Sequence, residues 1–337
     1  MRVLVTGGNG FVGLNLADAL LARGHECVLF DLREPPPVFV RSMKRLGFGG
    51  RLHVIAGDVC QPQDVARVFA VGGITHVFQG AAITAAAARE RSEPGRIFDV
   101  NLGGTLTVLA AARDAGVRRV LYPSSVAVYG ESLFDRALVT EDAPAVPEGL
   151  YGVSKYAAER AALRLGTLWN LEVVCGRIGN VFGPWEGETG LRDLVTPLAQ
   201  IAACAAHGNE AVLPDLRLQR DLIYSRDLSA ALVALLQAPI DSVARVMNLS
   251  VMADWSDIYQ RWCRILAASL SGFRWRVAAP GDSANVNYHD LRDRGRLDTT
   301  RLAAQLGFAP AFTPDEALND YARWLWDHPD FFAREAA

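Results

Sequence analysis

Tyr151 and Lys155 are the residues of this 337-residue chain best suited to chemistry. A spacing of four places the phenol and the ammonium on one face of a helix. There the compact positive charge would lower the pKa of the phenol from its usual value of about 10, so that the tyrosine could exchange a proton with an alcohol near neutral pH. Only Lys44 and Lys155 of the 34 basic residues are lysines. We interpret Lys155 as a position where the fork of an arginine cannot replace a compact ammonium.

Two serines precede this pair at a position suited to ligand binding. Ser124 and Ser125 directly follow an apolar run, residues 119–122, that predicts a strand. In a parallel α/β sheet, ligands bind at the carboxyl ends of the strands. A serine there could hold a substrate oxygen while Tyr151 takes its proton and Lys155 tunes the tyrosine, so the residues indicate oxidation of an alcohol.

A glycine-rich turn near the amino terminus indicates what accepts the hydride. Residues 2–6 predict a strand and residues 14–22 a helix, and between them lies a G-x-x-G-x-x-G pattern. Glycine at these positions allows a tight turn, and the pyrophosphate of a dinucleotide can then sit against the free N–H groups of the helix. We expect the cofactor to contact Gly7, Gly10, Phe11, Val12 and Gly13.

An acidic residue after the second strand indicates which dinucleotide binds. The strand at residues 26–30 ends at Asp31, and a carboxylate there would accept both ribose hydroxyls and repel a 2′-phosphate. The sequence therefore favours NAD over NADP, although Arg33 could partly compensate. Asp58, after the third strand, could meet the adenine amino group or could only cap a turn.

The elements that must position these residues alternate between strand and helix. Further strands are expected at residues 52–56, 76–79 and 172–177, each separated from the next by a helical stretch. This alternation predicts an α/β fold with a Rossmann-type, doubly wound parallel sheet. The pattern changes after residue 184, which predicts a second, smaller α/β lobe for the substrate. We expect an NAD-binding domain of residues 1–181 and about 216–250, and a substrate lobe of about 182–215 and 251–337.

Composition narrows the classes of partner. A net charge of −3 and a pI of about 6.1 argue against a nucleic-acid or anionic-membrane partner, because either would need a basic patch. The five cysteines lack the spacing of metal ligands, so we expect no metal and reduced thiols in a cytoplasmic protein. We find no signal peptide pattern and no apolar run as long as a membrane span.

With these features together, the chain resembles the extended short-chain dehydrogenase/reductases, a family that includes NAD-dependent epimerases and dehydratases such as UDP-galactose 4-epimerase. The resemblance rests on residues 6–13, 58–59, 81–82, 101–105, 124–130, 151–155, 177–184 and 220–224. It implies that Tyr151 is the general base, that Lys155 binds the nicotinamide ribose, and that Ser125 hydrogen-bonds the reacting oxygen.

The resemblance also implies further contacts and an assembly. Cofactor contacts are expected from Asp58, Val59, Ala81, Ala82 and Asn101. Asn101 would in addition support the packing of the active-site helix. In this family, helices around residues 98–113 and 151–166 commonly form a four-helix interface, which implies a homodimer.

Departures from the family pattern bear on the reaction. Dehydratases of the family place Asp-Glu where this chain has Val126 and Ala127, so we disfavour dehydration. Asn180 and Arg220 match residues that clamp the substrate diphosphate in epimerases. A second arginine of that clamp is replaced by Ala279, and Arg276, three residues earlier, is the candidate substitute.

Three functions follow from these residues. The first is an NAD-dependent UDP-sugar 4-epimerase that transiently transfers a hydride to tightly bound NAD. The alternative is a dehydrogenase that oxidises a free sugar or sugar acid and releases NADH, because residues 208–214 resemble D-erythronate dehydrogenase-type relatives. A non-catalytic NAD-binding protein is disfavoured, since such proteins typically lose the tyrosine or the lysine. We expect the pocket to be lined by the loop at residues 185–192, by Arg220 and by residues 276–296.

Overall fold

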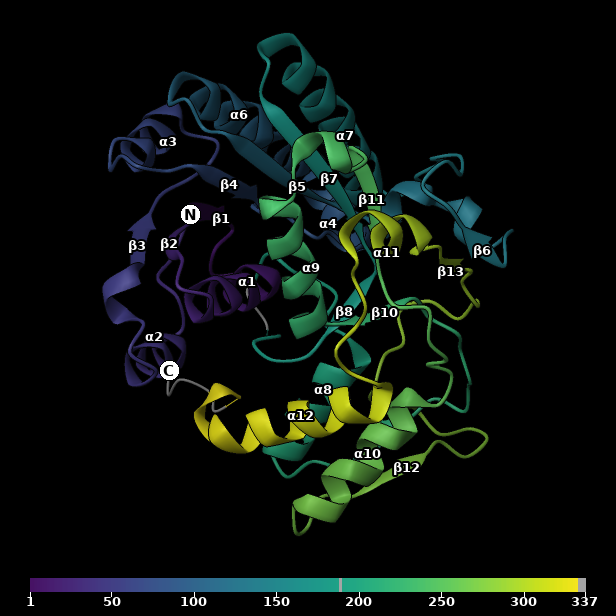
Figure 1. Ribbon diagram of the computed structural model, residues 1–337. Coiled ribbons are helices and arrows are strands. Elements are labelled where there is room, and N and C mark those ends of the chain that lie inside the picture. Colours follow the sequence, from purple (N-terminus) through teal and green to yellow (C-terminus); the bar gives the residue numbers. More distant parts are fainter. Residues whose placement is uncertain (188–189, 333–337) are drawn as a thin grey trace.

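The computed structural model describes residues 1–187 and 190–332. Its centre is a seven-stranded sheet in the order β3-β2-β1-β4-β5-β7-β11, with every neighbouring pair parallel (Figure 1). The strands are β1 (Arg2–Thr6), β2 (Glu26–Asp31), β3 (Leu52–Ala56), β4 (His76–Gln79), β5 (Arg119–Ser125), β7 (Glu172–Ile178) and β11 (Val246–Leu249). The predicted Rossmann-type sheet is confirmed.

Apolar runs form these strands because both faces of the sheet are covered. Successive side chains of a strand point to opposite faces. In β1, Val3 and Val5 therefore join the core on one face, and Leu4 joins the core on the other. All three side chains are fully buried.

Helices cover the two faces as separate layers (Figure 1). One layer contains α1 (Phe11–Ala22) and α9 (Ser225–Gln237), whose apolar side chains share a core with Val3 and Val5. The other contains α3 (Pro62–Phe69), α6 (Thr105–Asp114) and α7 (Leu150–Trp169). A π-helical turn, Asp99–Gly104, leads from α5 (Pro94–Phe98) into α6.

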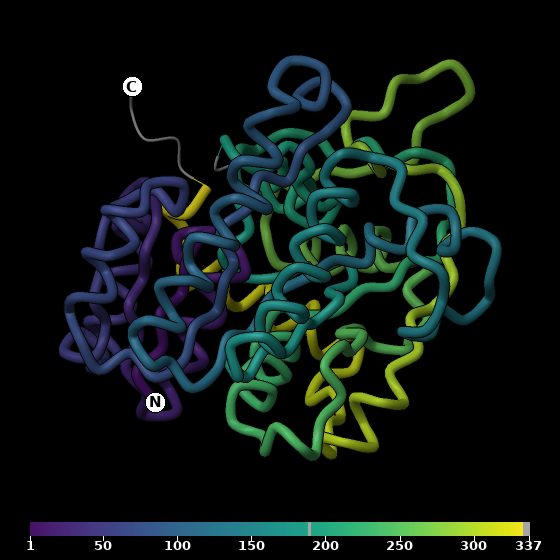
Figure 2. The backbone as a smooth tube through the Cα atoms, turned by 90° about the horizontal axis from the view of Figure 1, so that it is seen from above, coloured from purple at the N-terminus to yellow at the C-terminus, as the bar shows by residue number. Residues whose placement is uncertain are grey.

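A second group of elements follows the sheet. It contains α8 (Pro197–Ala206), α10 (Ile258–Ser269), α12 (Pro314–Asp327) and a parallel pair of strands, β9 (Ala211–Leu213) and β12 (Trp275–Val277). In Figure 2 these teal to yellow segments lie mostly away from the purple amino-terminal residues, and the yellow residues that follow α12 return toward them. There His328 hydrogen-bonds the buried Ser42 hydroxyl of α2 (Pro37–Arg45) at 3.2 Å.

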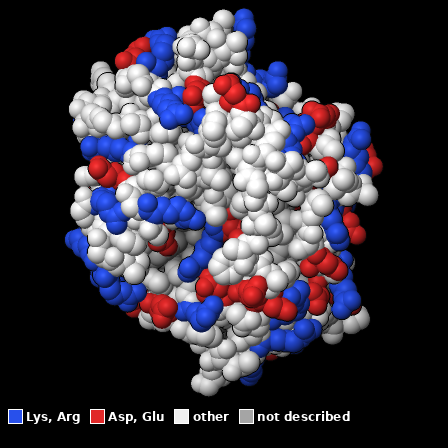
Figure 3. Space-filling model, in the orientation of Figure 1, with Lys and Arg blue, Asp and Glu red and all other residues white. Residues whose placement is uncertain are grey.

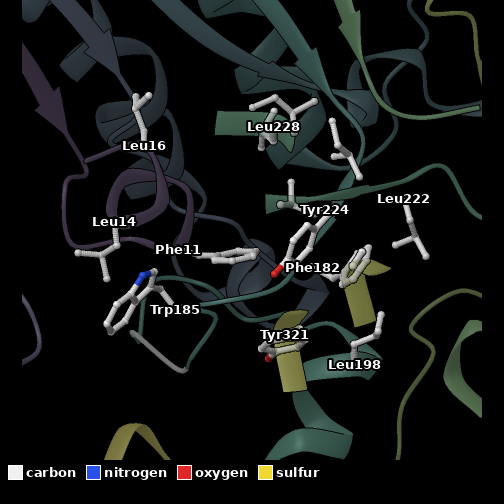
Figure 4. Close-up of a cluster of buried hydrophobic side chains, with 14 of the residues drawn as sticks. Phe11, Leu14, Leu16, Phe182, Trp185, Leu198, Leu222, Tyr224, Leu228 and Tyr321 are labelled. Carbon is white, nitrogen blue, oxygen red and sulfur yellow. The ribbon is translucent and has the colours of Figure 1, made fainter. Parts of the chain in front are cut away.

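One hydrophobic core joins both groups. Phe11 and Leu14 of α1 belong to the same buried cluster as Trp185 and Tyr321 (Figure 4). The division into an NAD-binding domain and a substrate lobe, with the boundaries given above, stays a prediction.

Shorter elements complete the described chain. They are α4 (Ala87–Ser92), α11 (Thr300–Leu306), the parallel pair β8 (Asn180–Phe182) and β10 (Leu222–Tyr224), the parallel pair β6 (Leu138–Val139) and β13 (Arg296–Leu297), and short 3-10 helices between them. In residues 1–187 and 190–332 we find no helix long and apolar enough to cross a membrane.

Candidate active site

A cavity of about 920 Å³ opens at the carboxyl ends of the strands. Most of the residues predicted from the sequence to bind or react line it. They are Gly7, Gly10, Phe11, Val12, Gly13, Asp31, Asp58, Val59, Ala81, Ala82, Ser124, Ser125, Tyr151, Lys155 and Asn180. Residues far apart in the chain thus meet in one space.

The glycine turn has the shape that a pyrophosphate needs. Gly7 has φ +62°, and a Cβ there would lie 2.7 Å from the backbone nitrogen of Ala81. At Gly13 a Cβ would lie 2.5 Å from the Gly7 carbonyl oxygen. Gly10 then caps α1 without a side chain, so the first N–H groups of the helix face the cavity. The turn fits a dinucleotide.

Asp31 occupies the end of β2 beside this turn. Its carboxylate accepts hydrogen bonds from the backbone N–H groups of Asn9 at 3.0 Å and Leu32 at 2.7 Å. Burial raises the pKa of Asp31, and these two bonds oppose the rise. These bonds fix the orientation of the carboxylate. Each of its oxygens can still accept a hydrogen bond from a ribose hydroxyl.

Asp58 is engaged mainly by protein groups. Its carboxylate accepts from the N–H of Cys60 at 2.8 Å and pairs with Arg96 at 3.3 Å. Burial would raise the pKa of Asp58, but the Cys60 and Arg96 contacts outweigh it and hold the pKa below its usual value. Asp58 therefore caps a turn and also lines the cavity, so both roles considered from the sequence fit its position.

Asn101 contacts a residue that lines the cavity, Ile83, and also the helix that carries Tyr151. It lies in the π-helical turn, and its amide accepts from the N–H of Ile83 at 2.8 Å and donates to the Ile83 carbonyl at 3.1 Å. The same amide donates to the Ser154 hydroxyl at 2.9 Å, and Ser154 donates to the carbonyl of Tyr151. This geometry suits the expected support of the active-site helix. Among the described residues, Asn101 is not part of the cavity lining.

Tyr151 shares the cavity with two hydroxyl groups, those of Ser125, at the end of β5, and Thr84. Burial raises the pKa of Tyr151 above its usual value, while the polar influence of these hydroxyls and the positive charge of Arg192 act in the opposite direction. The sequence predicts a lowered pKa caused by Lys155. The structure differs, because desolvation dominates and the cation that favours the phenolate is Arg192.

Lys155 is almost fully buried one helical turn further on. Its ammonium lies 4.2 Å from the centre of the Tyr122 ring, a cation–π contact. Burial lowers the pKa of Lys155 to about 7, against the raising influence of Cys175 and Glu159. The lysine is thus poised to gain or lose its proton near neutral pH.

Ser124 presents a buried hydroxyl that finds no hydrogen-bond partner within residues 1–187 and 190–332. It lines the cavity beside Ser125. A buried hydroxyl in this condition is suited to a bound ligand, which would supply the missing partner.

The residues expected to hold the substrate separate into two groups. Asn180 lines the cavity and donates to the carboxylate of Asp221 at 3.1 Å. Arg220 and Arg276 are not part of the lining in the described chain. The Arg220 guanidinium donates to the carbonyls of Gln219, Arg292 and Asp290. Arg276 is exposed and pairs with Glu210 at 3.4 Å and Asp282 at 2.5 Å.

Four other arginines of the described residues line the cavity instead, and Arg294 and Arg192 are two of them. Arg294 lies within the stretch 276–296 that the sequence suggests for the pocket, and its Nε is buried with no partner in the part of the chain that the structure describes. Arg192 lies 5.4 Å from the Phe11 ring centre and pairs with the fully buried Glu186 at 3.0 Å. The arginines that line the cavity and could meet an anionic ligand are therefore Arg192 and Arg294, whereas the sequence predicted Arg220 and Arg276. On the face shown in Figure 3, acidic and basic side chains are interspersed.

Residues 190–194, which we call the strap, run beside the cavity. Thr84 donates its N–H to the Leu191 carbonyl at 2.9 Å, and Asp193 donates its N–H to the Thr84 carbonyl at 3.1 Å. Leu191, Arg192 and Leu194 line the cavity. Residues 188 and 189 of the loop predicted at 185–192 lie outside the described residues. Sequence reasoning missed Thr84, and no motif in the chain marks it.

Comparison with known proteins fits this geometry. Residues 3–250 match the model of the NAD dependent epimerase/dehydratase family. The chain belongs to this family. It is 30% identical over 263 residues to a UDP-glucose 4-epimerase of Corynebacterium glutamicum, covering 74% of this chain and 75% of that protein. A UDP-glucose 4-epimerase of Lacticaseibacillus casei is 27% identical over 98% of this chain and 99% of its own length.

Solved structures agree with this membership. The crystal structure of a UDP-glucose 4-epimerase of Thermus thermophilus in complex with NAD superposes with a TM-score of 0.75 at 26% identity, over 100% of both chains. As a member of the NAD dependent epimerase/dehydratase family, the protein is an NAD-dependent enzyme of the extended short-chain dehydrogenase/reductase type. The expected cofactor, NAD, and the expected family are confirmed.

Proposed function

We propose that this family member is a UDP-sugar 4-epimerase. The observation that carries the proposal is a single cavity, lined at one end by the glycine turn and Asp31 and at the other by Asn180 and Arg294, with Tyr151 among its lining residues. Cofactor, base and an anion-binding end share one space. Relatives named UDP-glucose 4-epimerase, which match most of the chain, support the same substrate class.

The residues have distinct tasks in this reaction. NAD held by the glycine turn and Asp31 would supply a reversible hydride acceptor for C4 of the sugar. Tyr151 takes the proton of the 4-hydroxyl and later gives it back, and Ser125 holds the reacting oxygen. Lys155 contributes a donor to the nicotinamide ribose, and Arg192 contributes the positive charge that favours the phenolate. Ser124 is the second serine available at the same strand end.

Arg192 and Arg294 line the cavity, where they pair with Glu186 and Asp290. We propose that Asn180 and Arg294 contact the diphosphate, since both line the cavity and Arg294 has an unpartnered Nε there among the described residues. Arg220 stays a candidate, although its donors already serve three carbonyl groups. Arg276 also stays a candidate, although it is exposed and paired.

Incubation of the purified protein with UDP-glucose or UDP-galactose tests the proposal. We expect interconversion at C4, followed by nuclear magnetic resonance, without accumulation of free NADH at 340 nm. Stoichiometric NADH release with a sugar acid, together with no conversion of UDP-sugars, would establish the dehydrogenase instead. Tyr151→Phe should abolish turnover and retain NAD binding. Unchanged turnover in that variant would remove Tyr151 from the mechanism.

Assembly and location belong to the same proposal. Exposed leucines on α6 and α7, Leu106 and Leu168, support a homodimer built on these helices. Sedimentation analysis should then give twice the chain mass of 36.5 kDa. The five cysteines are all free, which supports a reducing, cytoplasmic location.

A further inference from the structure

Arg192 brings a positive charge from the strap to the glycine turn. Its guanidinium carbon lies 5.4 Å from the centre of the Phe11 ring, and both residues line the cavity. Phe11 is the first residue of α1 and directly follows Gly10 of the turn. Two segments that are far apart in the sequence therefore bring a cation and the amino-terminal end of a helix together.

The amino-terminal end of α1 has no counter-ion from its own sequence. Gly10 provides no side-chain cap, and the first turn of the helix holds no acidic residue. Among residues 1–187 and 190–332, the N–H groups of Phe11 and Val12 have no hydrogen-bond acceptor. The free N–H groups and the helix dipole both favour an anion at this place.

The guanidinium of Arg192 is held by protein groups along one side. Its Nη2 donates to Glu186 at 3.0 Å, and its Nε donates to the Leu194 carbonyl at 3.0 Å. Glu186 is fully buried and also accepts from the N–H of Thr196 at 2.9 Å and from the Thr196 hydroxyl at 2.6 Å. In the described part of the chain, the Nη1 of Arg192 has no hydrogen-bond partner. The planar fork is therefore oriented and keeps donors for an anion in the cavity.

We propose that Arg192 binds the pyrophosphate of NAD together with the N–H groups of Phe11 and Val12. A pyrophosphate carries two negative charges, and a guanidinium adds charge-assisted hydrogen bonds that N–H groups alone do not supply. Glu186 is then a positioning residue, because it orients the guanidinium without lining the cavity in the described chain. The inference concerns the cofactor, so it applies to an epimerase and to a dehydrogenase alike.

The three other arginines that line the cavity among the described residues have different positions. Arg33 follows the end of β2, where the ribose of the cofactor is expected. Arg96 pairs with Asp58 at 3.3 Å. Arg294 belongs to the stretch that the proposed function assigns to the substrate. Arg192 is thus the cation beside the turn that receives the pyrophosphate.

The test compares ligands with and without phosphate on Arg192→Gln. In the full-length protein freed of cofactor, we expect NADH and ADP-ribose to bind about tenfold more weakly than in the unaltered protein, because a charge-assisted contact to the pyrophosphate is lost. Adenosine shares the adenine and ribose contacts but has no phosphate, so its affinity should stay the same. Titration of NADH fluorescence, followed by displacement of NADH with ADP-ribose or adenosine, gives all three affinities.

Two further variants separate charge from folding. Removal of Arg192 alone leaves the buried Glu186 without its cation, which can destabilise the fold. The double variant Glu186→Gln with Arg192→Gln removes both charges and should show the same loss of NADH affinity. Arg51→Gln is the matched control, since Arg51 lies 5.2 Å from the Phe48 ring centre and donates to the Leu21 carbonyl at 2.9 Å. Arg51 is not part of the cavity lining in the described chain, so this variant should bind NADH as the unaltered protein does.

Three results would overturn the inference. One is an unchanged affinity for NADH and ADP-ribose in both Arg192 variants. Another is an equal loss for adenosine, which would indicate a general distortion of the site. The third is a loss of affinity for UDP, measured on the NAD-loaded protein, with unchanged affinity for NADH, because Arg192 would then serve the substrate. Failure of the unaltered protein to bind UDP would count against the proposed function alone, since the NADH measurements do not depend on it.

Discussion

The guanidinium of Arg89 holds both carboxylate oxygens of Asp193, at distances of 2.7 to 3.0 Å. Arg89 lies on α4, and Asp193 lies on the strap. The Arg89 contact holds the pKa of Asp193 below its usual range. The same guanidinium also donates to the Gly190 carbonyl at 2.9 Å. One arginine thus anchors both ends of the segment that contributes Leu191 and Arg192 to the cavity.

Asp193→Asn should loosen the strap. The amide removes the charge, and we expect a loss of about 1 to 2 kcal/mol in unfolding free energy for this partly buried, bidentate pair. Because the pKa of Asp193 is lowered in the fold, its contribution is present above the ordinary carboxyl pKa and is lost as the pH falls below it. NADH should dissociate about 3- to 10-fold faster, measured by the change in its fluorescence as it leaves the protein.

The control for this change is Asp114→Asn. Arg113 and Asp114 form a close pair at 2.6 Å, but their side chains are 42% and 66% exposed. Water screens such a pair, so stability and NAD release should stay as in the unaltered protein. Equal effects of the two substitutions would show that the strap is not held by its ion pair.

Arg294→Gln tests which arginine meets the substrate. Arg294 lines the cavity, whereas Arg276 is exposed and pairs with Glu210 and Asp282. Loss of a cation beside a diphosphate should raise the KM for UDP-galactose at least about tenfold and leave NAD affinity unchanged. Arg276→Gln is the matched control and should leave KM near the unaltered value. The reverse result would favour Arg276, the candidate taken from the sequence.

Asp221→Asn should stabilise the protein at neutral pH. Burial raises the pKa of Asp221 to about 6, and its Oδ2 has no partner among the described residues. A carboxyl with a raised pKa costs stability as the pH rises from about 4 to 6, since the folded state binds more protons than the unfolded state there. The amide avoids this cost and can still accept from Asn180. Urea unfolding at pH 7 should show a gain on the order of 1 kcal/mol that vanishes near pH 4. A gain of the same size at both pH values would contradict the explanation.

Asp31→Ser should weaken the preference for NAD. The substitution removes the charge that repels a 2′-phosphate, and Arg33, which lines the same part of the cavity, can then approach it. We expect NAD affinity to fall about tenfold and the ratio of NADP to NAD affinity to rise, measured by calorimetry on the cofactor-free protein. An unchanged ratio would mean that Asp31 does not select the cofactor.

The sequence predicts the parts of the site that depend on local pattern. Short motifs beside a strand or helix predict the glycine turn, Asp31 and the pairing of Tyr151 with Lys155. The alternating apolar runs predict the sheet that brings these residues together. The observed ends of helices and strands differ from the predicted ends by a few residues. β5, for example, extends through Ser125, because parallel pairing with β7 continues to that residue.

The missed features depend on contacts between distant segments. Thr84 lines the cavity in a segment whose backbone the strap and Asn101 hold, and no local pattern encodes that placement. Arg294 and Arg276 lie in the same stretch, and the sequence cannot tell which of the two points into the cavity. The pKa of Tyr151 depends on burial, which spacing along a helix does not report.

The π-helical turn at Asp99–Gly104 is equivalent to one residue inserted into an otherwise regular helix. Deletion of a single residue there would let α5 run into α6 with ordinary helical hydrogen bonds and would leave the buried face of α6 in place. The deletion would rotate Asn101 away from Ile83 and Ser154, so its hydrogen bonds to both residues would be lost. An irregularity of the backbone therefore lets one amide join the loop that follows β4 to the helix that carries the base.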